Sequence, residues 1–93
     1  MEFLVTLRQD WAALRECGDL DELMRREREA GAALLAEGTL GRIWRLPGER
    51  ANVGIWSAPD ATALHAQLAR LPLWPWLDAQ VVPLATHELE TTR

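Results

Sequence analysis

The chain has 93 residues, of which 48% are hydrophobic and 26% charged, and its formal net charge is −4. This length excludes a multi-domain enzyme, and the composition is typical of a folded chain rather than a disordered one. The acidic balance, without a long run of basic residues, disfavours a nucleic-acid-binding protein. All of the basic residues are arginine, so no lysine can act through a Schiff base. We expect a single domain over residues 1–93, with a polar tail over 85–93.

Cysteine and histidine usage excludes several classes of site. Cys17 is the only cysteine, which excludes a disulfide framework and a cysteine-rich metal site. His65 and His87 do not have the spacing of a metal-binding pair, so no metal site is expected. The chain shows neither a signal-peptide pattern nor an apolar segment of membrane-spanning length. We therefore expect a cytoplasmic protein with no membrane partner.

The chain begins with a predicted strand and loop. Residues 2–8 are β-prone and carry apolar side chains at both alternate sets of positions, as a strand covered on two faces does. The apolar residues within 9–18 do not recur regularly at either helical or strand spacing. We expect a loop there, with room for one helical turn around Trp11 and Leu14.

A long helix is predicted over residues 20–37. Asp19 and Glu22 have the spacing of a capping box, which satisfies backbone N–H groups at a helix start. The intervening residues are strong helix formers, and Gly38 stands at the typical stop position. These signals predict both ends of the helix.

A β-hairpin is predicted next. Residues 39–46 and 51–57 contain isoleucine, valine and tryptophan, which favour strands. The four residues 47–50, Pro-Gly-Glu-Arg, separate them and are typical of a turn. The two runs should therefore pair with each other.

A second helix and a last strand complete the pattern. Ser57 and Asp60 mark a helix start, with Ser57 expected as a cap, and the helix should end before Pro72. Prolines make residues 71–78 a stiff loop, and residues 79–84 read as a strand. The apolar stripe of this helix consists of Ala61, Leu64, Leu68 and Leu71.

The order of elements predicts an α+β fold of the ferredoxin-like βαββαβ type, a four-stranded antiparallel sheet with two helices on one face. The strands carry apolar residues on both faces, so the face without helices needs a cover. We expect a homodimer in which two sheets meet face to face, with the substrate pocket between them. A small-molecule substrate would bind there.

Glu27 is the strongest candidate for a catalytic residue. At 100° per residue it falls in the middle of the apolar stripe of the first long helix, where a carboxylate must be paired, pocket-lining or protonated. Burial would raise its pKa towards the range of a general base. The structural alternative is an ion pair with Arg8, Arg42 or Arg45. The stripe consists of Leu20, Leu23, Met24, Gly31, Leu34 and Leu35.

Other polar and aromatic side chains are candidates for substrate binding. Arg45 could hold a carboxylate, although an arginine at a strand end is more often a surface charge. Asn52 could donate to a carbonyl or enolate oxygen, although it could equally cap a turn. Arg8 and Arg42 could help to orient the substrate. Further candidates for the pocket lining are Trp44, Trp56, Trp74, Trp76 and His65, with a hydrophobic plug or subunit contact as the alternative for Trp74 and Trp76.

A set of short motifs extends over roughly residues 1–88. In chain order they are Glu27-x-Glu29, Glu37-Gly38-Thr39, Trp44-Arg45, Gly48, Ala51-Asn52, Leu64-His65, Leu71-Pro72-Leu73-x-Pro75-x-x-Asp78 and His87. With these motifs the chain resembles the muconolactone Δ-isomerase family.

The resemblance implies a dimeric α/β barrel whose dimers assemble into larger rings. It also implies an isomerase without a cofactor or metal, which moves a double bond in a small unsaturated lactone bearing a carboxylate. Glu27 matches the candidate base of that family. The chemistry needs one base of suitable pKa and donors for a dienolate oxygen.

The chain departs from the family pattern around the expected pocket. Leu40-Gly41-Arg42 stands where the family has an aromatic residue followed by Arg-His, so a pocket histidine is missing. Arg50 replaces an aromatic residue, Thr86 replaces an arginine, and Trp74-Pro75-Trp76 replaces Phe-Pro-Tyr. These differences imply a more aromatic pocket with a changed polar lining.

Three functions remain open from the sequence. The leading hypothesis is an isomerase that uses Glu27 for proton transfer on a small enolisable lactone or conjugated carbonyl compound. The first alternative is a natural-product tailoring isomerase or cyclase for a larger, polyketide-like substrate in an aromatic-lined cavity. The second is a non-catalytic ligand-binding subunit in which Glu27 is ion-paired.

Overall fold

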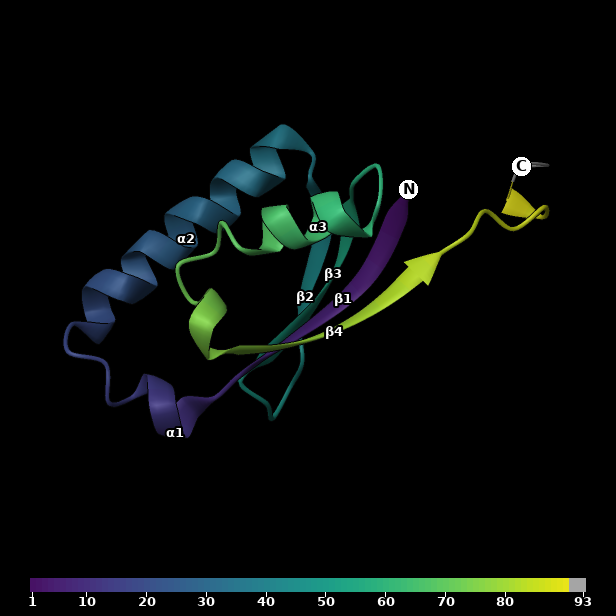
Figure 1. The fold of residues 1–93 in the computed structure, drawn as a ribbon. Helices are drawn as coiled ribbons and strands as arrows, with labels where there is room; N and C mark the ends of the chain where they lie inside the picture. The colour runs from purple at the N-terminus through teal and green to yellow at the C-terminus, as the bar shows by residue number, and fades with distance from the viewer. Residues whose placement is uncertain (91–93) are drawn as a thin grey trace.

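The computed structural model describes residues 1–90 and confirms the predicted α+β ferredoxin-like class (Figure 1). The strands are β1 (Glu2–Gln9), β2 (Leu40–Arg45), β3 (Ala51–Ser57) and β4 (Leu77–Leu84). The helices are α1 (Trp11–Leu14), α2 (Leu20–Glu37), α3 (Ala61–Leu68) and the 3-10 helix η1 (Trp74–Trp76). Among residues 1–90, no helix is long and apolar enough to cross a membrane.

The four strands form one antiparallel sheet in the order β2-β3-β1-β4. Figure 1 shows α2 and α3 on the same side of this sheet, as expected, and α1 beyond one end of β1. Phe3, Val5 and Leu7 of the central strand β1 are buried beneath the helices. Because side chains alternate along a strand, their cross-strand partners share that face.

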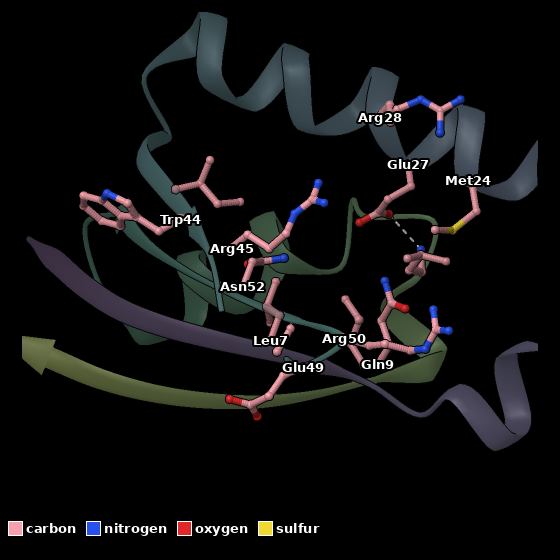
Figure 2. A pocket seen from close by; sticks show the side chains of 14 residues that line it. Leu7, Gln9, Met24, Glu27, Arg28, Trp44, Arg45, Glu49, Arg50 and Asn52 are labelled. Carbon is pink, nitrogen blue, oxygen red and sulfur yellow. Dashed lines mark hydrogen bonds between the residues drawn. The ribbon is translucent and has the colours of Figure 1, made fainter. Parts of the chain in front are cut away.

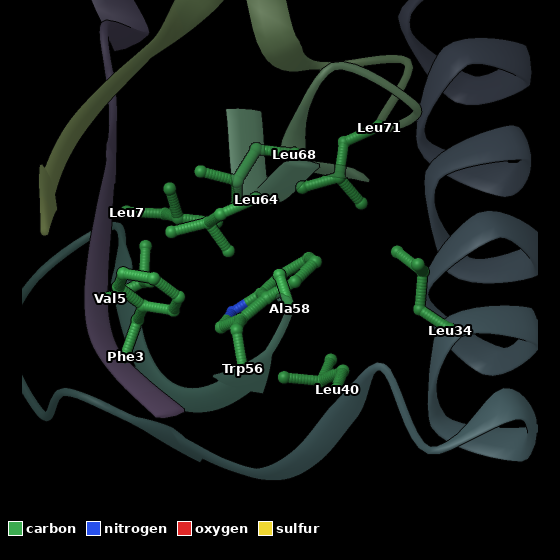
Figure 3. Close-up of a cluster of buried hydrophobic side chains, with 10 residues drawn as sticks. All are labelled: Phe3, Val5, Leu7, Leu34, Leu40, Trp56, Ala58, Leu64, Leu68 and Leu71. Atoms are coloured by element: carbon green, nitrogen blue, oxygen red, sulfur yellow. The ribbon is translucent and has the colours of Figure 1, made fainter. Parts of the chain in front are cut away.

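The main core fills the space between helices and sheet (Figure 3). Trp56 is its largest fully buried side chain, with 1% of its surface exposed. Gly54 lies on the same face, two residues earlier in β3, and has no side chain to compete for this space. A Cβ added at Gly54 would lie 2.9 Å from the carbonyl oxygen of Arg42 and 3.0 Å from Cδ1 of Leu40. The core consists of Phe3, Val5, Leu7, Leu34, Leu40, Trp56, Ala58, Leu64, Leu68 and Leu71.

Helix α2 begins and ends where the sequence predicts. The Asp19 carboxylate accepts a hydrogen bond of 3.1 Å from the backbone N–H of Glu22. Gly38 follows the last turn with φ of 81°, a left-handed conformation that glycine adopts at little cost. The apolar stripe is narrower than predicted, because Leu35 is exposed.

The start of α3 differs from the sequence prediction. Asp60, not Ser57, caps the helix, and its side chain accepts a hydrogen bond of 2.8 Å from the N–H of Ala63. Ser57 instead ends β3, where it pairs with Glu2 of β1. Ala61 is exposed, so the buried stripe of the helix consists of the leucines alone.

The proline-rich segment is more regular than the stiff loop that the sequence predicts. It contains η1, with Pro75 in its first turn, where a missing N–H costs nothing. Strand β4 begins at Leu77 rather than Ala79, because Leu77 pairs with Gln9. The pairing with β1 therefore extends β4 by two residues towards η1.

The predicted hairpin is present, with one irregularity. Its turn places Gly48 at φ of 81°. The register of β2 shifts between Leu40 and Arg42, so Leu40 lies opposite Trp56 and Ile43 lies opposite Gly54. This β-bulge puts both Leu40 and Ile43 on the helix-facing side, although strict alternation would separate them.

Among residues 1–90, no helix covers the other face of the sheet (Figure 1). Leu4 at its centre pairs with Ile55 on one side and with Val82 on the other. Trp44 and Val82 leave 45% and 44% of their surfaces exposed. We call these apolar side chains, Leu4, Trp44, Val53, Ile55 and Val82, the open face.

Candidate active site

A cavity of about 600 Å³ lies between α2 and the helix-facing side of the sheet, next to the β2–β3 turn (Figure 2). It combines apolar walls with several charged and amide side chains. This is the combination that small-molecule sites use for binding and orientation. The lining residues are Leu7, Gln9, Met24, Glu27, Arg28, Ile43, Trp44, Arg45, Glu49, Arg50, Ala51, Asn52, Leu73 and Leu77.

The position of this cavity corrects one sequence expectation. We expected the pocket between two facing sheets, but the cavity that contains Glu27 lies within one chain, on the opposite side of the sheet. Leu34 of α2 packs into the main core, and Leu23 of the same helix packs into a second cluster with Leu14 and Leu73. Glu27 lies between these two leucines on α2 and faces the cavity.

Glu27 points from α2 into the cavity, and its carboxylate Oε1 accepts a hydrogen bond of 3.0 Å from the backbone N–H of Leu73 (Figure 2). The side chain is half-buried. Burial raises the pKa of Glu27 above its usual range, and the Leu73 hydrogen bond opposes this rise only in part. No salt bridge among residues 1–90 involves Glu27. The ion-pair alternative with an arginine therefore has no geometric basis.

Arg45 and Asn52 face the same cavity from the sheet. They lie directly opposite each other on β2 and β3, so their side chains share one face. Figure 2 shows both reaching from the sheet towards the space that the Glu27 carboxylate enters. The Oδ1 atom of Asn52 is buried without a hydrogen-bond partner among the described residues. Such an unpaired acceptor is costly, and only the NH₂ group of the same amide, not this oxygen, can donate a hydrogen bond to a ligand.

The other two candidate arginines do not line the cavity. Arg8 forms a salt bridge of 3.1 Å with Glu49. Arg42 stacks on Trp44, with its guanidinium carbon 4.9 Å from the ring centroid. Both side chains belong to the alternate set of strand positions that faces away from α2.

The tryptophans are distributed differently from the expectation of an aromatic pocket. Trp44 borders the cavity, but its place opposite Val53 puts its side chain on the open face, and Figure 2 shows the indole pointing away from Glu27. Trp56 belongs to the main core because β3 turns it under the helices. Trp76 packs against a second buried cluster of Leu14, Leu23 and Leu73.

Trp74 and His65 lie at a different place. Their rings meet edge to face at a centroid distance of 5.6 Å. They line a smaller cavity of about 330 Å³ between α3 and β4, which does not contain Glu27. The structure therefore does not bring these two residues to the catalytic candidate.

Several lining residues were not among the substrate-binding candidates predicted from the sequence. Gln9 is the last residue of β1 and shares the helix-facing side with Leu7, so the alternation of the strand could have found it. Met24 lies one helical turn before Glu27 and was placed only as a core residue. Arg50 lies in the turn, where the sequence gives no direction to a side chain. Figure 2 shows the guanidinium of Arg28 pointing away from the Glu27 carboxylate.

The described residues give little basis for a metal centre. Among residues 1–90, no three histidine, cysteine, aspartate or glutamate side chains are grouped so that they could hold a metal ion. The polar groups of the cavity are instead two carboxylates, of which Glu27 has a raised pKa, together with amides and guanidinium groups. This set is suited to moving a proton and stabilising an oxyanion.

Comparison with known proteins identifies the family. The family model described as muconolactone delta-isomerase matches residues 1–90. The chain belongs to the muconolactone Δ-isomerase family. It is 36% identical to the muconolactone Delta-isomerase of Pseudomonas aeruginosa over 67 residues, which cover 72% of this chain and 70% of the relative. It is 31% identical to muconolactone Delta-isomerase 2 of Acinetobacter lwoffii over 87 residues, which cover 94% and 86%.

Solved structures agree with this assignment. A crystal structure of muconolactone isomerase superposes with a TM-score of 0.83 and 32% identity, covering 95% of this chain and 92% of the other. An uncharacterized NIPSNAP domain protein from Burkholderia xenovorans reaches a TM-score of 0.50 at 18% identity, covering 95% and 96%, which shows a shared fold only. The chain is thus an intramolecular isomerase of the muconolactone-isomerase kind.

Proposed function

We propose that this isomerase moves a double bond by cofactor-free proton transfer in a small unsaturated lactone or conjugated carbonyl compound. The observation that carries the proposal is the half-buried Glu27 carboxylate, which lies in the cavity with a raised pKa and no arginine partner among the described residues. A base of raised pKa holds an abstracted proton more firmly than an ordinary glutamate does. It can still return that proton within the same cycle.

The proton would be removed from the carbon next to the carbonyl group or, where the double bond is already conjugated with the carbonyl, from the γ carbon. In both cases the electron pair would move onto the carbonyl oxygen as a dienolate. Asn52 and Arg45, side by side on the sheet, can donate hydrogen bonds to that oxygen. Protonated Glu27 would then return the proton to another carbon of the conjugated system. The double bond moves, and no atom is gained or lost.

The two alternatives receive less support. A tailoring enzyme with a cavity walled by tryptophans would need several of them in one place. Of the proposed set, only Trp44 borders the cavity with Glu27, and its side chain lies on the open face. A non-catalytic subunit would explain Glu27 as an ion pair, but no salt bridge within residues 1–90 includes Glu27. The cavity volume of about 600 Å³ suits a small substrate with surrounding water.

We further propose that the protein is a homodimer, formed through the open face of the sheet. The exposed apolar side chains there, among them Trp44 and Val82, would be buried by a second copy. The cavity lies on the other side of the sheet, so this contact would not cover it. Each protomer would keep its own cavity accessible to substrate.

The experiment that tests the isomerase proposal follows muconolactone and related enolisable lactones by proton NMR in D₂O. We expect the wild type to move the double bond, with deuterium entering the product only as far as protonated Glu27 exchanges with the solvent before it returns the proton. We expect Glu27→Gln to be slower by about 10² to 10⁴-fold. Glu29→Gln is the matched control, because Glu29 is exposed on the same helix and pairs with Arg25. Equal rates for wild type and Glu27→Gln, with both folded by circular dichroism, would contradict the proposal.

A further inference from the structure

A stacked pair of residues borders the cavity at the hairpin turn. The guanidinium carbon of Arg50 lies 3.8 Å from the ring centroid of Trp11, which is a close cation–π contact. Arg50 lines the cavity with Glu27, but it comes from the turn before β3 (Figure 2). The stack therefore fixes a flexible, exposed side chain at the rim of the cavity.

Trp11 is itself held in place. It packs against the second buried cluster, which contains Leu14, Leu23 and Leu73. Its helix α1 is capped by Asp10, whose side chain accepts a hydrogen bond of 3.3 Å from the N–H of Ala13. The short helix thus presents one indole face to the turn, where Arg50 lies on it.

The backbone of Arg50 is fixed as well. Its carbonyl oxygen accepts a hydrogen bond of 2.9 Å from the N–H of Gln9, the last residue of β1. The neighbouring Glu49 is paired with Arg8 at 3.1 Å and does not pair with Arg50. No salt bridge among residues 1–90 uses the Arg50 guanidinium, which keeps its donors available.

Charge at the cavity is opposite in sign to charge on the whole chain. The protein has a formal charge of −4. The cavity, however, is lined by Arg45 and Arg50 against Glu27 and Glu49, of which Glu49 is paired with Arg8. A positive cavity in an acidic protein attracts an anionic ligand and holds it by charge-assisted hydrogen bonds.

We propose that Arg50, positioned by Trp11, is a specificity-determining residue that binds a carboxylate of the substrate at the rim of the cavity. This inference rests on the proposed isomerase function. Arg45 and Asn52 remain free for the reacting carbonyl, because Arg50 supplies a separate cation. Trp11 is a positioning residue that acts only through Arg50.

The test compares muconolactone, which carries a carboxylate, with its neutral methyl ester. We expect Arg50→Gln to lower kcat/KM for the acid about tenfold, mostly through KM, and to leave the ester unchanged. Arg50→Lys should restore part of the preference for the acid, since it keeps the charge. Trp11→Leu should reduce the preference in the same direction, and added salt should weaken it because Arg50 is exposed.

Arg42→Gln is the matched control. Arg42 also stacks on a tryptophan, at 4.9 Å, but it lies outside the cavity. An acid-to-ester ratio that is unchanged in Arg50→Gln, or that falls equally in Arg42→Gln, would overturn the inference.

A failure of the inference about Arg50 can be distinguished from a failure of the proposed isomerase function. If the wild type converts neither compound, the isomerase proposal fails, and dissociation constants for the same two compounds, measured by titration calorimetry, still test Arg50. Tighter binding of the acid that is lost in Arg50→Gln would support the inference. Equal binding of acid and ester by the wild type, or binding of neither, would overturn it.

Discussion

The carboxylate of Glu27 and the backbone N–H of Leu73 are joined by a hydrogen bond of 3.0 Å across 46 positions of sequence. Leu73 itself is buried in the cluster beside the cavity. The bond uses one carboxylate oxygen and leaves the other available for a proton. It holds the proposed base in one orientation without neutralising it, which an arginine partner would do.

The first prediction concerns the pH dependence of catalysis. Burial raises the pKa of Glu27 above the ordinary 4.5, and only the ionised form can accept a proton from the substrate. We expect kcat/KM to fall on the acid side with a midpoint above 4.5. A profile measured by the change in absorbance as the double bond enters or leaves conjugation with the carbonyl checks this. A midpoint at or below the ordinary value would contradict burial as the dominant influence.

The second prediction concerns stability and follows from the same shift. Because the pKa of Glu27 is higher in the folded state than in the unfolded state, the folded state is favoured at low pH and loses stability as pH rises through the folded pKa. Glu27→Gln retains an acceptor for Leu73 and has no charge. We expect its Tm to exceed that of the wild type at pH 7, and the difference to shrink below pH 4.5. A constant difference across this range would contradict the shift.

The third prediction separates function from stability at Asn52. Its buried Oδ1 has no partner among the described residues, so Asn52→Leu removes a costly polar atom from the folded protein. The same change removes a donor for the dienolate oxygen. We expect kcat to fall by about 10² to 10³-fold while Tm is unchanged or raised. Thermal unfolding and steady-state kinetics check both parts, and a large loss of Tm would mean that Asn52 is structural.

The fourth prediction uses two glycines as a matched pair. At Gly54 a Cβ would meet the backbone oxygen of Arg42 at 2.9 Å, whereas at Gly31 in α2 nothing lies within 4 Å. Gly54→Ala should destabilise the protein by about 1 to 3 kcal/mol. Gly31→Ala should stabilise it by about 0.5 to 1 kcal/mol, because alanine favours helix. Urea unfolding measures the free energy of unfolding of both variants. Equal effects of the two substitutions would contradict a steric clash of the added methyl group at Gly54.

The fifth prediction tests the proposed dimer. Val82 lies on the open face with 44% of its surface exposed, so Val82→Glu should place a charge in the contact and shift the protein towards monomer. Ala36→Glu, at an exposed position on α2, is the control and should leave the assembly unchanged. Light scattering after size exclusion gives the mass of each variant. A monomeric wild type would contradict the proposal.

Local signals explain why the elements could be predicted from the sequence. Asp19 and Gly38 fix both ends of α2 through hydrogen bonds to nearby backbone groups, which depend on only a few residues. The place of Glu27 on the buried side of α2 follows from the helical period alone. The Pro-Gly turn likewise predicts the hairpin.

Contacts between distant segments decided the rest. Alternation along a strand gives two sets of side chains but not the face that each set occupies, so it could not tell whether Trp56 lines a pocket or fills the core. The bulge between Leu40 and Arg42 then broke the alternation itself. Only the packing of α2 and α3 on one face of the sheet decided which strand side chains are buried beneath the helices and which lie on the open face.

The sequence by itself determined the order and limits of most elements and the candidate base, because caps, turns and helical periodicity act over a few neighbouring residues. The tertiary structure decided where the cavity lies and which residues share it with Glu27. Leu73, Asn52 and Arg50 reach Glu27 or its cavity from segments far away along the chain. Such proximity depends on how helix and sheet pack, and no local pattern encodes it.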